Sequence, residues 1–216
     1  MRSMLVIGVG RFGSNLAVKL TELGNDVMVI DQDEDAVQKI APLVTAAQIG
    51  DCMDIEVLRS IGARSFDVCF VCISENFQSS LEITSLLKDL GAPMVVAKAD
   101  REIHAKFLLR IGADEVIYPE RDMARRTAAR FSTKGAFDYI ELSDEYAIFE
   151  FALPEHWIGK NLRELNIRGR YHVNIIGLKK DGRVTPLTDP EYAFQKEEHI
   201  LAAGTNENLS RILKES

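Results

Sequence analysis

Short apolar runs alternate with longer segments of helical periodicity over residues 1–132. Continuous apolar runs are typical of strands buried on both faces, and apolar residues three and four apart are typical of helices packed against them. The pattern therefore predicts an α/β fold with a doubly wound parallel sheet in the strand order 3-2-1-4-5-6. The predicted strands are Met4–Ile7, Val27–Ile30, Leu43–Ile49, Phe66–Ile73, Met94–Ala97 and Glu115–Tyr118.

Residues 133–216 carry a different pattern. A small-residue break at Ser132–Ala136 is the predicted linker between two domains, residues 1–132 and residues 133–216. Beyond it, shorter runs separated by turn residues predict a small α+β domain without a glycine-rich phosphate loop. Lys180-Asp181-Gly182 contains the Asp-Gly pair typical of a tight hairpin turn. The predicted elements are strands Asp138–Leu142, Ala147–Ala152, Val173–Lys179, Val184–Pro186 and His199–Ala203, and one helix, Asn161–Leu165.

Three glycines, Gly8, Gly10 and Gly13, lie between the first predicted strand and the helix that follows it. The first allows a sharp turn off the strand, the second lets the backbone approach a phosphate, and the third lets helix and strand pack closely. Asp31 ends the second strand about 20 residues further on, where a carboxylate accepts hydrogen bonds from ribose hydroxyls. The helix N-terminus adds unpaired N–H groups and a partial positive charge. This succession predicts a Rossmann-like nucleotide-binding domain.

Further polar residues fall beside the glycine turn or at the carboxyl ends of the predicted strands, where this fold gathers its ligand contacts. Arg11 can add charge at a phosphate, although a surface arginine at a helix start is the alternative. Asp51 can accept from an adenine amine or cap a helix, and Ser74 or Asn76 caps the next long helix beside the same rim. Lys98 can meet a phosphate, an acidic neighbour or only solvent. Together with two sequence neighbours, the predicted nucleotide site comprises Gly8, Gly10, Arg11, Phe12, Gly13, Asp31, Asp51, Cys52, Ser74, Asn76 and Lys98.

The composition argues against a nucleic-acid-binding protein and against a membrane-spanning protein. With 26 basic and 33 acidic side chains the formal net charge is −7, and no basic block occurs, so we expect no nucleic-acid partner. No run approaches the roughly 20 apolar residues that span a bilayer, and the N-terminus enters a predicted strand with no room for a signal peptide. Three cysteines fit a reducing cytoplasm.

Cys69 and Cys72 have the C-x-x-C spacing of redox and zinc sites. Both fall in the predicted strand Phe66–Ile73, where residues three apart point to opposite faces of the sheet. The two thiols therefore cannot easily meet or share a metal, and we expect both to be core residues.

A nicotinamide-dependent dehydrogenase of this layout needs a second domain with a substrate pocket and a proton donor. Only His156 and His172 lie in loop-like stretches of that domain, and neither has a carboxylate companion at motif spacing. The sequence also lacks nucleophile-elbow and zinc signatures. These observations favour binding without turnover, and an NAD(P)-dependent oxidoreductase is the alternative.

Six segments, in order, resemble the N-terminal domain of the RCK (TrkA-N) family: GVGRFG, VIDQD, GDCMDIEVLRSIG, VCISENFQSS, KADREIHAKFLLRIGADEVIYPERDMA and DYIELSDEY. The segment GKNLRELNIRGRYHVNIIGLKKDG resembles the family's C-terminal domain (TrkA-C). One copy of each domain resembles the cytosolic gating subunits of Ktr-type potassium transporters. The resemblance implies a non-enzymatic subunit that binds ATP or ADP, and an NAD/NADH-sensing subunit of Trk type is the alternative.

The resemblance also implies an assembly. It predicts a homo-octameric ring, a tetramer of dimers, beneath a membrane-embedded potassium-translocating subunit. The chain is then cytoplasmic and peripheral at the inner face of the cell membrane. Subunits pair through the helix Glu120–Phe131, which places Glu120 close to a neighbour's nucleotide. Because a carboxylate and a triphosphate repel each other, Glu120 is the predicted ligand of a bridging Mg²⁺ or Ca²⁺; favouring its own helix N-terminus is the alternative.

The run Asn166–Ile175 resembles the segment that binds cyclic di-AMP across a two-fold interface in some Ktr-type subunits. Arg168 suits the phosphates and Asn174 suits the adenine edge, so the resemblance implies a second ligand site there. A strand edge with a surface arginine is the alternative.

Overall fold

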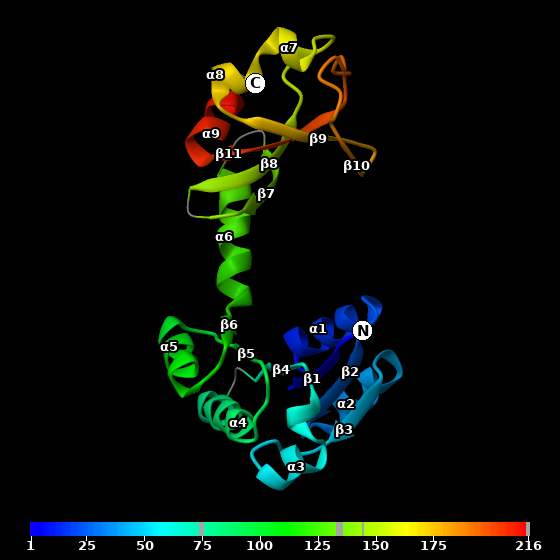
Figure 1. Cartoon of the computed structure of the whole chain (residues 1–216), viewed down its shortest axis with the longest axis vertical. Helices are drawn as coiled ribbons and strands as arrows, with labels where there is room; N and C mark the ends of the chain where they lie inside the picture. The colour runs from blue at the N-terminus through cyan, green and yellow to red at the C-terminus, as the bar shows by residue number, and fades with distance from the viewer. Residues whose placement is uncertain (74–75, 133–135, 144, 215–216) are drawn as a thin grey trace. The chain divides into compact units, whose positions relative to one another are not determined.

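The computed structural model describes residues 1–73, 76–132, 136–143 and 145–214. The chain divides into two compact units, Met1–Glu120 and Arg121–Ser216 (Figure 1). Helix α6 (Pro119–Ser132) crosses this division, and most of it groups with the second unit, whereas the sequence assigned it to the first domain. The boundary predicted at residues 132–133 stays a prediction, because linker residues 133–135 lie outside the described residues.

The first unit is built around a six-stranded sheet in the order β3-β2-β1-β4-β5-β6. All five neighbouring pairs are parallel, which confirms the predicted doubly wound, Rossmann-like fold. The strands are β1 (Ser3–Ile7), β2 (Asp26–Asp31), β3 (Ala46–Ile49), β4 (Val68–Val71), β5 (Val95–Lys98) and β6 (Glu115–Ile117). The helices between them are α1 (Arg11–Glu22), α2 (Glu34–Ile40), α3 (Ile55–Ser60), α4 (Phe77–Asp89) and α5 (Glu102–Ile111).

The third strand is shorter than predicted. A 3₁₀ turn occupies Ala41–Leu43, and β3 begins only at Ala46. Pro42 lies at the start of this turn, where its fixed φ is compatible with helical backbone, so Leu43 belongs to the turn and not to the strand. Thr45 connects the turn to the sheet: its hydroxyl accepts a hydrogen bond from the Val27 amide at 3.0 Å.

Each face of this sheet has its own apolar core. Leu87 of α4 and Leu108 of α5 pack in the same cluster as Cys69. Ala17 of α1 packs in a separate cluster with Cys72. Both thiols are buried and free, which confirms that the C-x-x-C pair consists of core residues on opposite faces.

The second unit contains a five-stranded antiparallel sheet in the order β10-β9-β11-β8-β7, which confirms the predicted α+β domain. One face carries an apolar core centred on Trp157, which is 1% exposed and stacks on Phe194. The strands are β7 (Ala136–Glu141), β8 (Tyr146–Ala152), β9 (Asn174–Lys180), β10 (Arg183–Pro186) and β11 (His199–Thr205). Short helices cover this core: α7 (Leu162–Leu165), α8 (Ile167–Tyr171), α9 (Asn206–Lys214) and a 3₁₀ turn at Glu155–Trp157.

The hairpin predicted in this unit is present. Asp181 and Gly182 form the two-residue turn between β9 and β10, and both have positive φ, +50° and +76°. Positive φ at both central residues is what a turn matching the twist of the strands requires, and Asp-Gly supplies it. Helix α7 also forms as predicted, with Asn161 and Glu164 making a reciprocal capping box. Helices α8 and α9 were not predicted.

Candidate functional site

A cavity of about 700 Å³ opens at the carboxyl edge of the parallel sheet. Its walls come from the turns that follow β1, β2, β3 and β4, from the end of β5 and from Glu120 after β6, at the edge where ligands bind in open α/β sheets. Gly8 and Gly10 border it after β1, and Asp31 borders it after β2. Asp51 follows β3 and Lys98 ends β5, so residues far apart in the sequence converge on one site.

The glycine turn has a different geometry at each of its three positions. Gly8 has φ +91°, a backbone conformation that residues other than glycine rarely adopt. A Cβ on Gly13 would overlap the carbonyl oxygen of Gly8, well inside 3.0 Å, so α1 approaches the turn as closely as glycine allows. A Cβ on Gly10 would have no atom within 4 Å, because this position borders the cavity. The turn therefore leaves room for a ligand at Gly10 and none at Gly13.

Asp31 ties the end of β2 to the glycine turn. One carboxylate oxygen accepts a hydrogen bond from the Val9 amide at 2.7 Å, and the other accepts from the Asp33 amide at 3.0 Å. Each carboxylate oxygen has a second lone pair, so both can still accept from ligand hydroxyls. Gln32, next along the chain, also lines the cavity.

The loop after β3 provides a second acid and a thiol. Asp51 accepts a hydrogen bond from the Met53 amide at 2.9 Å. The helix-cap alternative for Asp51 is wrong, because Asp54 caps α3 and accepts from the Glu56 amide. Burial, with the charges of Asp51 and Asp31 adding to it, raises the pKa of Cys52 to about 12.

Asn76 caps helix α4, accepting a hydrogen bond from the Ser79 amide at 3.1 Å, and also lines the cavity. The two functions predicted for this residue are therefore compatible. Ser74, the other predicted cap, lies outside the described residues.

Lys98 and Glu120 form an ion pair at the rim of the cavity. The Lys98 ammonium lies 2.7 Å from Glu120 Oε1 and 5.8 Å from the centre of the Phe12 ring. Lys98 is only 7% exposed, so the solvated-lysine alternative is wrong and the acidic neighbour is present. The hydrogen bond from Lys98 holds the pKa of Glu120 below its ordinary value.

The structure thus brings ten of the predicted residues around one cavity and packs Gly13 against the carbonyl of Gly8, outside the lining. The ten are Gly8, Gly10, Arg11, Phe12, Asp31, Asp51, Cys52, Asn76, Lys98 and Glu120. Sequence reasoning missed the apolar wall and several polar neighbours. The missed lining residues are Ile7, Ile30, Gln32, Gly50, Met53, Cys72, Ile73, Ser79 and Ile83. The isoleucines and Cys72 have the sequence pattern of core residues, so periodicity could not single them out.

Arg168 and Asn174 lie in the second unit, and both are exposed. Arg168 belongs to α8 and not to a strand, but it is an exposed surface arginine, as the alternative stated. Asn174 begins β9.

A hydrogen-bonded chain of Ser80, His104 and Asp100 lies between α4 and α5. Ser80 Oγ is 2.6 Å from His104 Nε2, and His104 Nδ1 is 3.0 Å from Asp100 Oδ1. The order of groups matches a catalytic triad, but Ser80 and His104 are fully buried. No substrate can reach a fully buried hydroxyl. This hydrogen-bond network therefore joins two helices and is not a nucleophilic site.

The described residues offer neither a metal-ion cluster nor a helix that could span a membrane. They contain no group of three or more His, Cys, Asp or Glu side chains placed to hold a metal ion. Within the same ranges, every helix is too short or too polar to cross a bilayer.

The fold and this cavity define a Rossmann-type nucleotide-binding domain followed by a small α+β domain. Two family models match the chain, the TrkA-N domain over residues 4–119 and the TrkA-C domain over residues 147–216. The chain belongs to the TrkA-N/TrkA-C family, as its motifs indicated.

Two curated relatives span nearly the whole chain. Ktr system potassium uptake protein C of Bacillus subtilis (strain 168) is 38% identical over 215 residues, 99% of this chain and 96% of that protein. Ktr system potassium uptake protein A of the same organism is 33% identical over 214 residues, with the same coverage. Both are named as potassium uptake proteins and not as enzymes.

A solved structure of the GsuK channel bound to NAD shares the fold, with a TM-score of 0.66 and 20% identity. The match covers 97% of this chain and 38% of that one, so this chain spans well under half of the channel polypeptide.

Proposed function

We propose that this chain is the cytosolic regulatory subunit of a Ktr-type potassium transporter, and that it gates its membrane partner in response to ATP and ADP. The observation that carries the proposal is the cavity at the carboxyl edge of the sheet, where Asp31 and the glycine turn meet Lys98 and Glu120. The Ktr relatives, which match over nearly the whole chain, support the potassium-transport setting.

The cavity offers separate positions for the parts of an adenine nucleotide. Asp31 is the acceptor for the ribose hydroxyls, and its charge disfavours a 2′-phosphate. Asp51 accepts from the adenine amine. The open backbone at Gly10, the guanidinium of Arg11 and the N-terminus of α1 receive the phosphates.

Replacing Asp31 with alanine is expected to weaken ATP and ADP binding by about 1.5–3 kcal/mol, the scale of a hydrogen bond to a charged group. Calorimetric titration of the full-length variant measures this loss. Asp35→Ala, which removes an exposed carboxylate from the first turn of α2, is the matched control and should bind as the wild type does. Unchanged titrations in Asp31→Ala would remove Asp31 from the site.

NAD or NADH is the second candidate ligand, favoured by the NAD-bound GsuK channel with the same fold. A ligand that binds the native state raises thermal stability by mass action. Melting curves with ATP, ADP, NAD and NADH in turn therefore rank the four ligands. A larger shift with NAD or NADH than with ATP or ADP would replace the adenine-nucleotide proposal with the Trk-type alternative.

Gating by ATP and ADP requires the two nucleotides to favour different shapes of the assembly, because a ligand shifts an equilibrium only by its differential affinity. The proposed assembly is a homo-octamer, a tetramer of dimers, at the inner face of the membrane. Moving such a ring from mostly one shape to mostly the other takes about 5.5 kcal/mol of differential binding free energy. Divided among eight subunits, this is on the order of 1 kcal/mol for each nucleotide site.

Glu120 is the proposed ligand of a divalent cation. Within this chain it is one carboxylate paired with Lys98, so a cation there needs further oxygen ligands from the nucleotide phosphates. A terminal phosphate competes for the Lys98 ammonium, and a Glu120 released from that pair can face Mg²⁺ or Ca²⁺ across the rim.

Replacing Glu120 with glutamine is expected to abolish the dependence of ATP-stimulated potassium flux on divalent cations, because the neutral amide is a poor ligand for hard cations. The measurement is flux through the reconstituted complex with ATP or ADP, with and without Mg²⁺ or Ca²⁺. Arg11→Ala is the companion variant, and it should retain the cation dependence while losing discrimination between ATP and ADP. A Glu120→Gln complex that keeps both properties contradicts the metal bridge.

Cyclic di-AMP is the proposed second ligand, with Arg168 for its phosphates and Asn174 for its adenine edge. Both side chains are exposed and thus accessible to a ligand. Calorimetry that gives no heat with cyclic di-AMP on the wild-type protein would end this part of the proposal.

A further inference from the structure

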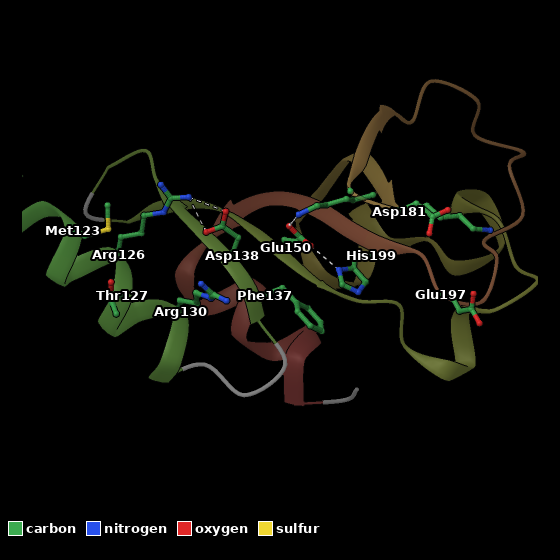
Figure 2. Close-up of a pocket in the computed structure, with 13 residues that line it drawn as sticks. Met123, Arg126, Thr127, Arg130, Phe137, Asp138, Glu150, Asp181, Glu197 and His199 are labelled. Atoms are coloured by element: carbon green, nitrogen blue, oxygen red, sulfur yellow. Dashed lines mark hydrogen bonds and ion pairs between the residues drawn. The ribbon is translucent and has the colours of Figure 1, made fainter. Parts of the chain in front are cut away.

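A second cavity, of about 580 Å³, lies wholly within the second unit (Figure 2). It lies on the face of the antiparallel sheet opposite the Trp157 core, and its walls come from α6, β7, the β9–β10 hairpin and β11. The nucleotide cavity shares none of its lining residues. The residues proposed to bind ATP or ADP and cyclic di-AMP do not line this cavity.

The floor of the cavity holds a buried carboxylate with two partners on neighbouring strands. Glu150 of β8 is 7% exposed and accepts hydrogen bonds from Lys179 of β9 and from His199 Nδ1 of β11, both at 2.7 Å. Burial alone would raise the pKa of Glu150, but the hydrogen bonds and charges of its two partners hold it below the ordinary value. A buried charge kept on a cavity floor, away from the apolar core, marks a candidate binding site.

His199 presents a second nitrogen to the cavity. Its Nδ1 is taken by Glu150, and Nε2 makes no hydrogen bond to any described residue. Phe137 stacks on one face of the imidazole, with ring centroids 4.2 Å apart and planes 25° apart, so a ring contact and a hydrogen bond together orient His199. The oriented imidazole can accept or donate one hydrogen bond to a molecule in the cavity.

The α6 end of the cavity is basic. Met123, Arg126, Thr127 and Arg130 follow the three-and-four spacing of one helical face, and all four line the cavity. Arg126 is neutralised by Asp138, whose two carboxylate oxygens lie 3.0 and 2.9 Å from Nη2. Arg130 forms no ion pair with a described residue, so this end carries one uncompensated positive charge.

The opposite end of the cavity is acidic. Figure 2 shows Asp181 and Glu197 there, well separated from Arg126 and Arg130. Neither carboxylate forms an ion pair with a described residue. Among the residues that line the cavity, Lys180 is the cation next to Asp181 in the sequence. Two carboxylates and one ammonium leave one negative charge at this end.

The lining of the cavity therefore carries opposite surplus charges at its two ends. Arg130 carries the surplus positive charge at one end and Asp181 with Glu197 the surplus negative charge at the other, while the ion pair of Glu150 and Lys179 between them is neutral. A simple anion is attracted to one end and repelled by the other, and the same holds for a simple cation. A molecule with opposite charges at its two ends matches both ends at once.

We propose that this cavity binds a small dipolar organic molecule, with its carboxylate or phosphate at Arg130 and Thr127 and its ammonium group at Asp181 and Glu197. The Nε2 atom of His199 makes a hydrogen bond to the middle of the ligand. A volume of about 580 Å³ falls within the usual range of small-molecule sites. This inference does not rest on the nucleotide proposal.

The test is calorimetric titration of the full-length protein with a series of probes at millimolar concentration. ε-Aminocaproate and γ-aminobutyrate carry both charges at different separations, caproate carries only the anion, and hexylamine only the cation. Saturable binding of at least one dipolar probe, at least tenfold tighter than caproate or hexylamine, is expected. Equal binding of a singly charged probe, or no binding of either dipolar probe, would overturn the proposal.

Variants at the two ends identify where the probe lies. Arg130→Gln and Glu197→Gln should each weaken the dipolar probe about tenfold, the loss of about 1.4 kcal/mol expected for one charged contact. Arg125→Gln is the matched control, because Arg125 is an exposed arginine of α6 that does not line the cavity. Undiminished binding in both end variants would also overturn the proposal. Titrations with ATP and ADP in the same variants show separately whether the nucleotide site is intact.

Discussion

Replacing Gly13 with alanine is expected to lower the free energy of unfolding of the first unit by about 3 kcal/mol, the upper range for forcing an extra carbon into a filled space. The added Cβ would overlap the carbonyl oxygen of Gly8 and lie 3.1 Å from the Cys72 Cβ. Because a backbone oxygen cannot rotate away as the end of a side chain can, α1 would have to move off the sheet. Denaturant unfolding followed by circular dichroism measures the loss.

Gly10→Ala is the matched control from the same turn. Its φ is −62°, and the new Cβ would have no atom within 4 Å, so the fold should keep its wild-type stability. The methyl group would instead enter the cavity, where nucleotide binding should weaken. A Gly13→Ala protein as stable as Gly10→Ala would show that the close approach of helix and turn is not needed.

Replacing Trp157 with alanine is expected to destabilise the second unit by about 3–5 kcal/mol, the cost of removing a large buried ring and leaving a cavity. Trp157 is 1% exposed, and its ring lies 6.1–6.4 Å from those of Phe194, Tyr171 and Phe151. Such a loss is a large share of the total stability of a typical domain. Thermal unfolding followed by circular dichroism should show an earlier transition.

The control for this variant is His156→Ala, which removes an exposed ring from the adjacent position and should change stability little. Since Trp157 is the one tryptophan of the chain, its fluorescence in the wild-type protein reports unfolding of the second unit alone. A Trp157→Ala protein with an unchanged transition would contradict the assignment of this ring to the centre of the core.

The parallel sheet could be predicted because its signals are local. Short apolar runs and the glycine turn give the strands and their order, and the structure confirms both. The predicted start of β3 at Leu43 was wrong, because a 3₁₀ turn with Pro42 in its first turn takes up Leu43 and the strand begins only at Ala46. Helix α9 had a usable signal in the spacing of Leu209, Ile212 and Leu213, all buried. Helix α8 had almost none, because Gly169 interrupts its five residues.

The candidate site was predictable residue by residue, but its contacts were not. Lys98 and Glu120 were each named from the sequence, yet their pairing depends on the register of β5 with β6, which aligns Lys98 with Ile117. The buried group of Glu150 and His199 was missed for the same reason. It requires the register of β8 with β11, which no local pattern encodes.

The three buried cysteines have a practical consequence for measuring movement. Burial raises the pKa of Cys52, Cys69 and Cys72 to about 12, so each thiol stays protonated near neutral pH and reacts slowly with alkylating reagents. A cysteine introduced at an exposed position would be labelled ahead of all three without first removing them. Two such labels, one on each unit, would allow the distance between the units to be measured spectroscopically. Changes in that distance would report the shape changes that ATP and ADP are proposed to produce.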